Sequence, residues 1–95
     1  MAYSLMEIEK FHVVYILQLS DRAFYTGYTA SFEQRIRQHE SGEVVSTRGR
    51  RPVKLVYFEA CLSKKDALAR EKYLKSSYGK QRLRKRLKYW LSQNL

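Results

Sequence analysis

The chain has 95 residues, of which 44% are hydrophobic and 29% charged, and its formal net charge is +10 at pH 7. This length suits one domain, and the hydrophobic content excludes a chain that is disordered throughout. Its one cysteine, Cys61, excludes an intramolecular disulfide, and no apolar run reaches the roughly 18 residues that span a bilayer. We therefore expect a cytoplasmic protein without a membrane partner, with residues 1–10 as an N-terminal extension and residues 11–93 as a single domain.

The positive charge is concentrated in the second half of the chain. Residues 1–40 hold four Lys or Arg and five Asp or Glu, a net charge of −1, whereas residues 41–95 hold fifteen and four, a net charge of +11. A basic half on a small domain favours a polyanionic partner, usually nucleic acid. A basic surface that only keeps the protein soluble is the alternative.

The first predicted element is a hairpin. Residues 12–19 and 24–28 have the β-branched and aromatic content of strands, and residues 20–23 (Ser-Asp-Arg-Ala) supply a turn between them. The short connection predicts antiparallel pairing. Gly27, late in the second strand, indicates a bulge or the close approach of another group.

A helix should follow the hairpin. Ser31 and Gln34 have the S-x-x-Q spacing of a capping box, which predicts a helix from there to about Glu40. Arg35 and His39 are four residues apart and therefore share one face of this helix. They are either hydrated surface residues or a phosphate-binding guanidinium beside an acid or base that titrates near neutral pH.

Residues 41–52 are predicted to form a loop, and residues 53–62 a third strand. The loop is either an ordinary solvated segment or one that grips phosphate through Arg48, Arg50 and Arg51. Along the third strand we expect simple alternation, with Leu55, Tyr57 and Glu59 on one face and Val56, Phe58 and Ala60 on the other.

Two helices should complete the chain. Ser63 and Asp66 resemble a second capping box, opening a helix over residues 64–77 that ends near Gly79, and a last helix should cover residues 80–93. The outer face of that last helix carries Lys80, Arg82, Arg84, Lys85, Arg86 and Lys88. The order β-β-α-β-α-α predicts an α+β fold, in which helices flank a small, mostly antiparallel three-stranded sheet.

Glu71 interrupts the inner stripe expected for the helix over residues 64–77. A carboxylate stands there among Ala67, Leu68, Leu74 and Tyr78. An unpaired buried carboxylate costs several kcal/mol, so it needs a cation. The cation is either an arginine in a salt bridge or a hard divalent metal.

These features, in this order, resemble the signature of the GIY-YIG nuclease superfamily. Val13-Val14-Tyr15 matches the first triplet, Tyr25-Thr26-Gly27 the second, Arg35 with His39 the helix landmark, and Glu71 the later glutamate. The resemblance covers roughly residues 11–92 and is strongest to small stand-alone bacterial members, described as similar to the nuclease domain of an excinuclease. Two features depart from the pattern: the first triplet lacks its glycine and isoleucine, and Asn94 is not placed where some members have a catalytic asparagine.

The resemblance implies a DNA endonuclease, with DNA repair as its setting and one Mg²⁺ or Mn²⁺ as cofactor. It implies Tyr15 as general base, Tyr25 as a ligand of the water or phosphate, and Glu71 as the metal ligand. Arg35 and His39 would favour the tyrosine anion, and Arg35 would also neutralise charge on the phosphate.

The expected nucleic-acid-binding residues are Gly27, Arg48, Arg50, Arg51, Lys80, Arg82, Arg84 and Lys85. DNA is favoured over RNA as the partner, and an accessory protein could supply substrate specificity. The alternative function is a DNA- or RNA-binding module on the same fold without turnover.

Overall fold

The computed structural model describes residues 10–94, so nearly all of the expected N-terminal extension lies outside the described residues. The described part is an α+β domain, as predicted. Its elements in chain order are β1 (His12–Gln18), β2 (Phe24–Thr29), α2 (Phe32–Ser41), α3 (Val45–Arg48), β3 (Lys54–Cys61), α4 (Lys64–Lys75), α5 (Ser77–Arg86) and α6 (Lys88–Gln93).

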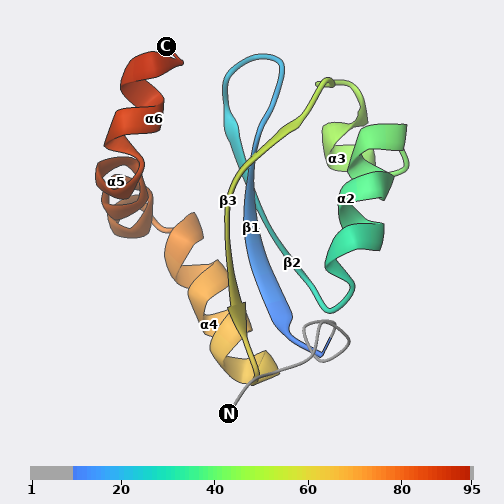
Figure 1. Cartoon of the computed structure of the whole chain (residues 1–95), viewed down its shortest axis with the longest axis vertical. Helices are drawn as coiled ribbons and strands as arrows, with labels where there is room; N and C mark the ends of the chain where they lie inside the picture. Colours follow the sequence, from blue (N-terminus) through green and yellow to red (C-terminus); the bar gives the residue numbers. More distant parts are fainter. Residues whose placement is uncertain (1–9, 95) are drawn as a thin grey trace.

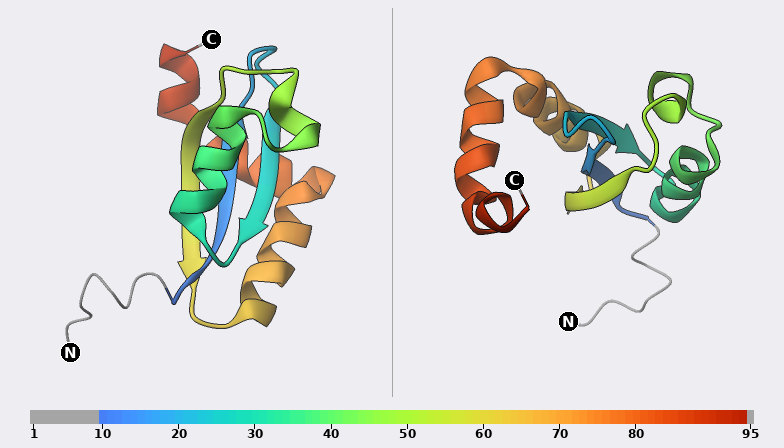
Figure 2. Two further views of the ribbon diagram at one scale, coloured as in Figure 1. Left: turned by 90° about the vertical axis from the view of Figure 1, so that its right-hand side faces the viewer. Right: turned by 90° about the horizontal axis from the view of Figure 1, so that it is seen from above.

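The sheet is antiparallel with strand order β2-β1-β3, and it forms the middle of three layers. Helices α2 and α3 lie on one face, and α4, α5 and α6 lie on the other (Figures 1 and 2). The central strand β1 is buried on both faces, which explains its uninterrupted apolar run Val-Val-Tyr-Ile-Leu.

The two faces of β1 contribute to two separate cores. Tyr15 and Leu17 face α2 and pack with Phe32 and Ile36, among others. On the opposite face, Val14 and Ile16 pack with Ala67, Leu74 and Leu83, which come from α4 and α5. Because side chains alternate along a strand, consecutive residues of β1 serve opposite layers.

A bulge in β3 breaks the predicted alternation of that strand. Tyr57 lies opposite Ile16, but the next partner pair is Leu17 with Leu55, so Val56 is an extra residue. Val56 and Tyr57 both pack against the α4–α5 core. The predicted division of residues 55–60 between two faces is therefore wrong at this point.

The starts of α2 and α4 were predicted correctly in position, but only one of the two expected caps forms. The Ser31 side chain makes no capping hydrogen bond to α2; the Ser31 backbone N–H instead donates to Thr29 Oγ1 at 2.9 Å. The Ser63 hydroxyl does accept a hydrogen bond from the Asp66 N–H, so this second cap is confirmed. The predicted loop over residues 41–52 contains the short helix α3.

The C-terminal helices divide differently from the prediction. Helix α4 ends at Lys75, and Gly79 lies in the first turn of α5 rather than at a helix end. A Cβ atom at Gly79 would lie 1.9 Å from the carbonyl oxygen of Tyr73, so only glycine lets α5 pack this closely against the end of α4. The predicted last helix is two helices, because the chain bends at Leu87.

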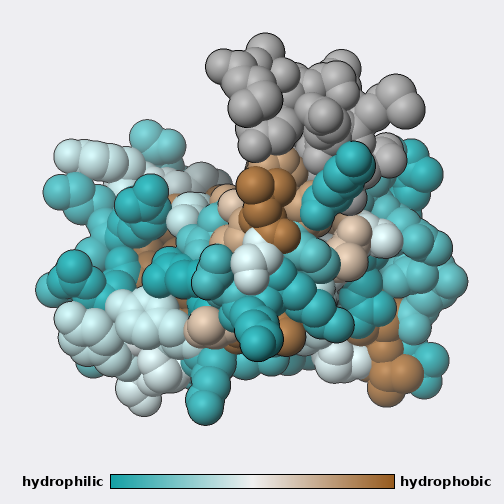
Figure 3. Space-filling view, turned by 90° about the horizontal axis from the view of Figure 1, so that it is seen from below, coloured by the Kyte–Doolittle hydropathy of each residue, from teal (hydrophilic) through white to brown (hydrophobic). Residues whose placement is uncertain are grey.

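The surface at the end of the molecule where β1 begins is mostly hydrophilic, with hydrophobic side chains in a few small areas (Figure 3). Within residues 10–94, every helix is too short or too polar to span a bilayer.

Candidate active site

Tyr15 lies at the middle of β1, fully buried, directly opposite Gly27 of β2. A Cβ atom at Gly27 would lie 2.4 Å from both Cζ and Oη of Tyr15. The space beside the glycine is therefore filled by the tyrosine ring, and packing accounts for this glycine. A contact between Gly27 and nucleic acid stays a prediction.

Three buried side chains form a hydrogen-bonded chain at the end of this ring. Tyr15 Oη lies 2.7 Å from His39 Nε2, and His39 Nδ1 lies 2.8 Å from Thr47 Oγ1. His39 is on α2 and Thr47 on α3, and both are completely buried. This series of hydrogen bonds therefore connects the central strand to both helices that cover this face.

His39 is uncharged at neutral pH. Burial lowers its pKa from 6.5 to about 4, and the positive charge of Arg35 contributes to the same shift. A neutral imidazole has one donor nitrogen and one acceptor nitrogen, and the Thr47 hydroxyl can pair with either form. His39 thus gives Tyr15 a hydrogen bond rather than a positive charge.

Arg35 supplies the positive charge of the site. It lies on α2, one turn before His39, and its Nη1 donates to Gln38 Oε1 at 3.3 Å. Burial raises the pKa of Tyr15, contact with Arg35 opposes that shift, and the nearby Tyr25 and Glu71 add to it. Arg35 is thus close enough to act on the Tyr15 phenol.

Tyr25 lies next to Tyr15 and His39. Its ring centroid is 6.4 Å from that of Tyr15 and 5.1 Å from that of His39, which it meets edge to face. Tyr25 is only half-buried, whereas Tyr15 is fully buried. The part of the cluster that reaches solvent therefore includes Tyr25.

Glu71 comes from the opposite layer, on α4, which packs against β1 and β2. Its side chain is 21% exposed, and one of its oxygens lies 3.2 Å from Nζ of Lys75. Its charge acts on Tyr15, since it raises the pKa of that phenol.

The predicted inner stripe is wrong at Leu68 and Tyr78, which are 40% and 61% exposed.

Glu71 could hold a divalent metal, with water and substrate supplying the other ligands. No group of three or more His, Cys, Asp or Glu is arranged for metal binding within residues 10–94. Mg²⁺ is commonly held by one or two carboxylates and keeps several waters. A single, partly exposed carboxylate oxygen therefore fits Mg²⁺ or Mn²⁺, and does not fit a metal held by protein ligands alone.

The predicted basic residues lie in two places. Arg50 forms an ion pair with Asp21 in the hairpin turn, and its Nη2 lies 2.6 Å from Asp21 Oδ2. Arg51 donates hydrogen bonds to the carbonyl oxygens of Arg48 and Glu40. The other predicted cations, Lys80, Arg82, Arg84 and Lys85, are exposed on α5, across the sheet from Tyr15. The structure thus brings the loop arginines to the α2–α3 layer and keeps the α5 cations in the opposite layer.

Comparison with known protein families decides what kind of domain carries this cluster. Residues 11–92 match the model of the GIY-YIG catalytic domain. The chain belongs to the GIY-YIG family. This result confirms the family that the sequence resembles, and it supports a nuclease-type domain at the level of the family as a whole.

Relatives of this GIY-YIG domain share its sequence over most of their length. A UPF0213 protein of Haloquadratum walsbyi is 49% identical over 67 residues, covering 70% of this chain and 75% of the relative. A UPF0213 protein of Clostridium perfringens is 48% identical over 71 residues, covering 74% and 76%. The NMR structure of a UPF0213 protein of Bacillus halodurans matches with a TM-score of 0.51 and 42% identity, covering 77% of this chain and 81% of that one.

The residues that depart from the GIY-YIG signature lie in β1 and after α6. Val13 and Val14 are buried on opposite faces of β1, so both positions contribute to the cores and neither has a polar side chain. Asn94 follows α6, where its Nδ2 donates to the carbonyl oxygen of Trp90 at 2.8 Å.

Thr47 is the site residue that sequence reasoning missed, because the segment around it was expected to be a loop. The three-residue spacing of Val44 and Thr47, both buried, is the one sequence signal of a helical turn here.

Proposed function

We propose that this protein is an endonuclease that hydrolyses DNA phosphodiester bonds with one divalent metal ion. The observation that carries the proposal is the Tyr15 hydroxyl, placed 2.7 Å from the neutral His39 and beside Arg35 in a GIY-YIG domain. Phosphodiester hydrolysis needs a base for the attacking water and positive charge for the phosphate. This cluster offers both.

Tyr15 is the proposed general base, and its proton cannot simply move to His39. The His39 pKa of about 4 is far below the ordinary tyrosine value of 10.0, so the imidazole is a much weaker base than the phenolate. His39 instead orients the phenol and, through an N–H on Nε2, can donate a hydrogen bond to the phenolate. Thr47 fixes the imidazole by bonding to Nδ1.

Arg35 and Tyr25 are the proposed phosphate contacts. A guanidinium favours the tyrosine anion and can bind two phosphoryl oxygens at once. In this role Arg35 acts both on Tyr15 and on the substrate. Tyr25, half-buried at the solvent side of the cluster, offers a hydroxyl that can hold the phosphate or the attacking water.

Glu71 is the proposed ligand of Mg²⁺ or Mn²⁺. When bound, such an ion stabilises negative charge on the leaving oxygen. The Lys75 ammonium lies 3.2 Å from Glu71, so this surface pair must open before the carboxylate can bind a cation. Opening it requires little free energy, because an exposed ion pair contributes about 0–1 kcal/mol.

The rest of the substrate would be held by further residues, all of them cationic except Gly27. The proposed backbone contacts are Gly27, Arg48, Arg50, Arg51, Lys80, Arg82, Arg84 and Lys85. We favour DNA over RNA, a cytoplasmic role in DNA repair, and an accessory protein that directs the domain to its substrate. The support for this part is the net charge of +11 in residues 41–95 and the family match.

The test is a nicking assay on supercoiled plasmid with Mg²⁺ or Mn²⁺, with and without a chelator. We expect nicking that the chelator abolishes and that Glu71→Ala and Arg35→Ala remove, with unchanged circular dichroism. Wild-type activity in both folded variants would rule out the proposed site. A gel shift without any cleavage by the wild-type protein would favour the alternative, a nucleic-acid-binding module without turnover.

A further inference from the structure

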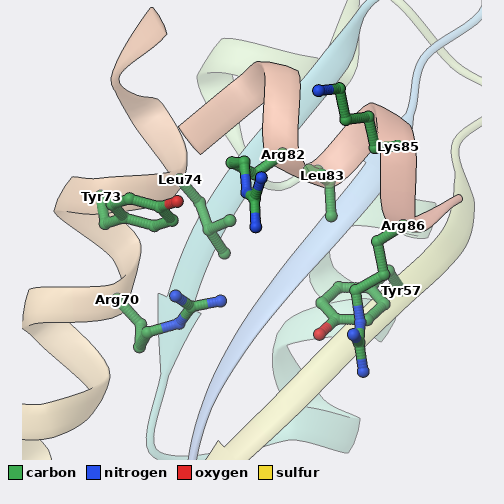
Figure 4. Close-up of a pocket in the computed structure, with 8 residues that line it drawn as sticks. All are labelled: Tyr57, Arg70, Tyr73, Leu74, Arg82, Leu83, Lys85 and Arg86. Atoms are coloured by element: carbon green, nitrogen blue, oxygen red, sulfur yellow. The ribbon is translucent and has the colours of Figure 1, made fainter. Parts of the chain in front are cut away.

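A second concave site lies on the face of the sheet opposite Tyr15. It is a pocket of about 500 Å³ between α4, α5 and β3 (Figure 4). Its floor includes the buried Leu74 and Leu83, which belong to the core on the α4–α5 side. Tyr15 belongs to the other core and is not part of the pocket lining.

The pocket carries an excess of positive charge. Four of its lining residues are cationic: Arg70, Arg82, Lys85 and Arg86. Glu59 neutralises one of them, since its Oε2 accepts from Arg70 Nη2 at 3.1 Å, which leaves a net charge of about +3 from four cations and one carboxylate. Arg82 and Lys85 form no ion pair with any residue between 10 and 94.

The cations come from two helices and converge. Arg70 extends from α4 and Arg82 from α5, and their guanidinium groups point toward each other across the pocket (Figure 4). Glu59 holds the Arg70 side chain in this direction, and contact with Arg70 keeps the pKa of Glu59 below its usual range. Glu59 accepts from Nε and Nη2 of Arg70. Arg70 therefore offers its Nη1, and Arg82 its whole guanidinium group, to a phosphate above the apolar floor.

A flat platform lies beside the converging arginines. The Arg86 guanidinium carbon is 5.8 Å from the centroid of the Tyr57 ring, and the Tyr57 hydroxyl donates to Glu59 Oε2 at 2.9 Å. Tyr57 is therefore held in place, with the Arg86 guanidinium over its ring. Nucleic-acid bases stack on both aromatic rings and arginine planes.

We propose that this pocket binds one unpaired nucleotide of a single strand, with its phosphate between Arg70 and Arg82 and its base against the Arg86–Tyr57 pair. The inference deepens the proposed nuclease function and rests on it for the nature of the substrate. A pocket of about 500 Å³ admits one extruded nucleotide but not a base-paired duplex. The preferred DNA substrate would then have a single-stranded stretch that reaches the face of the sheet opposite Tyr15.

The test is a titration of ¹⁵N-labelled Glu71→Gln protein, which keeps the fold but lacks the proposed metal ligand, with a 5′-phosphorylated four-residue oligothymidylate. We expect amide shifts at Tyr73, Leu74 and Leu83. Arg82→Ala and Lys85→Ala should each weaken binding at least fivefold. Lys72→Ala removes a positive charge from the exposed side of α4, outside the pocket, and should weaken binding less than twofold.

Equal losses in Arg82→Ala and Lys72→Ala, or shifts confined to the Tyr15 cluster, would overturn the pocket assignment. Thymidine 5′-monophosphate and inorganic phosphate serve as comparison ligands. Tighter binding of the free mononucleotide than of the oligonucleotide would contradict a strand-binding role. Binding here by a protein that never nicks DNA would support the pocket and refute the nuclease, whereas nicking without pocket binding would do the reverse.

Discussion

At the scale of single residues, the position of Tyr15 depends on three other side chains or backbone positions. Its ring requires a glycine on the neighbouring strand, its hydroxyl requires His39, and His39 in turn requires Thr47. None of these partners is near Tyr15 in sequence. Each can be replaced alone, which allows the contributions of packing, hydrogen bonding and charge to be separated.

Replacing Gly27 should disturb both stability and the site. Gly27→Ala places a methyl group 2.4 Å from Tyr15 Oη, and Tyr15 can move only by breaking its bond to His39. Overpacking of this kind costs about 1–3 kcal/mol. Gly49→Ala is the matched control, because nothing lies within 4 Å of the added carbon. Urea unfolding measures both; equal stabilities of the two variants would contradict the packing role.

His39 should make stability depend on pH. Its folded pKa of about 4 is below the ordinary value of 6.5, so the unfolded chain takes up the proton first, and stability is lost as pH falls through that window. Between pH 7 and 4.5 this amounts to about 2 kcal/mol. In urea titrations at the two pH values, His39→Gln should lose about 2 kcal/mol less than the wild type. The same loss in both proteins would show that His39 titrates normally.

At the scale of elements, the domain depends on how helices begin. Ser76 is the N-cap residue of α5, and its side chain accepts a hydrogen bond from the Gly79 N–H at 3.1 Å. The close contact of Gly79 with Tyr73 determines how closely α5 packs against the end of α4. That junction carries Leu74 and Leu83 into one core. The direction of α5, and with it the position of Arg82, therefore depends on a local cap.

Removing this cap should destabilise the domain measurably. Ser76→Ala loses the capping hydrogen bond of α5 and should lower the free energy of unfolding by about 1 kcal/mol. Ser31→Ala changes the same residue type at the start of α2, where no side-chain cap exists. It should lower the free energy of unfolding by only a few tenths of a kcal/mol. Thermal unfolding measures both. A larger loss in Ser31→Ala would contradict this assignment of the caps.

Much of the fold was predictable because strand and helix patterns are local. The hairpin and the position of β3 followed from strand patterns and turn residues, and the start of α2 followed from the spacing of Ser31 and Gln34. The catalytic roles given to Tyr15, Arg35, His39 and Glu71 followed from the resemblance to the GIY-YIG signature. The bulge at Val56 and the break at Leu87 arise from packing between layers, which no local pattern records. Thr47 was missed because its segment was expected to be a loop and because its partner His39 is eight residues away.

For the whole molecule, charge is the dominant property. Residues 41–95 carry a net +11, and α5 holds much of it on an exposed face. Such a surface binds nucleic acid mainly by releasing counterions, so affinity should fall steeply with salt and vary little with sequence. It also leaves the choice of substrate to shape rather than to base sequence.

The salt dependence should respond to single substitutions on α5. Lys80→Ala and Arg84→Ala should each weaken binding to all DNA sequences alike and reduce the slope of log K against log salt by about 1. Fluorescence anisotropy on two unrelated duplexes, at several salt concentrations, measures this. A loss limited to one duplex would mean that α5 reads sequence.

Tyr15 is the proposed general base in metal-dependent phosphodiester cleavage, and the proposed nuclease site depends on this role. The most direct test is the nicking rate of Tyr15→Phe beside that of Tyr89→Phe, in which an exposed tyrosine loses the same hydroxyl. General base catalysis contributes about 10²–10⁴-fold, so Tyr15→Phe should be at least about 100-fold slower, and Tyr89→Phe should remain within twofold of the wild type. A folded Tyr15→Phe protein that nicks DNA within tenfold of the wild-type rate would show that Tyr15 is not the general base.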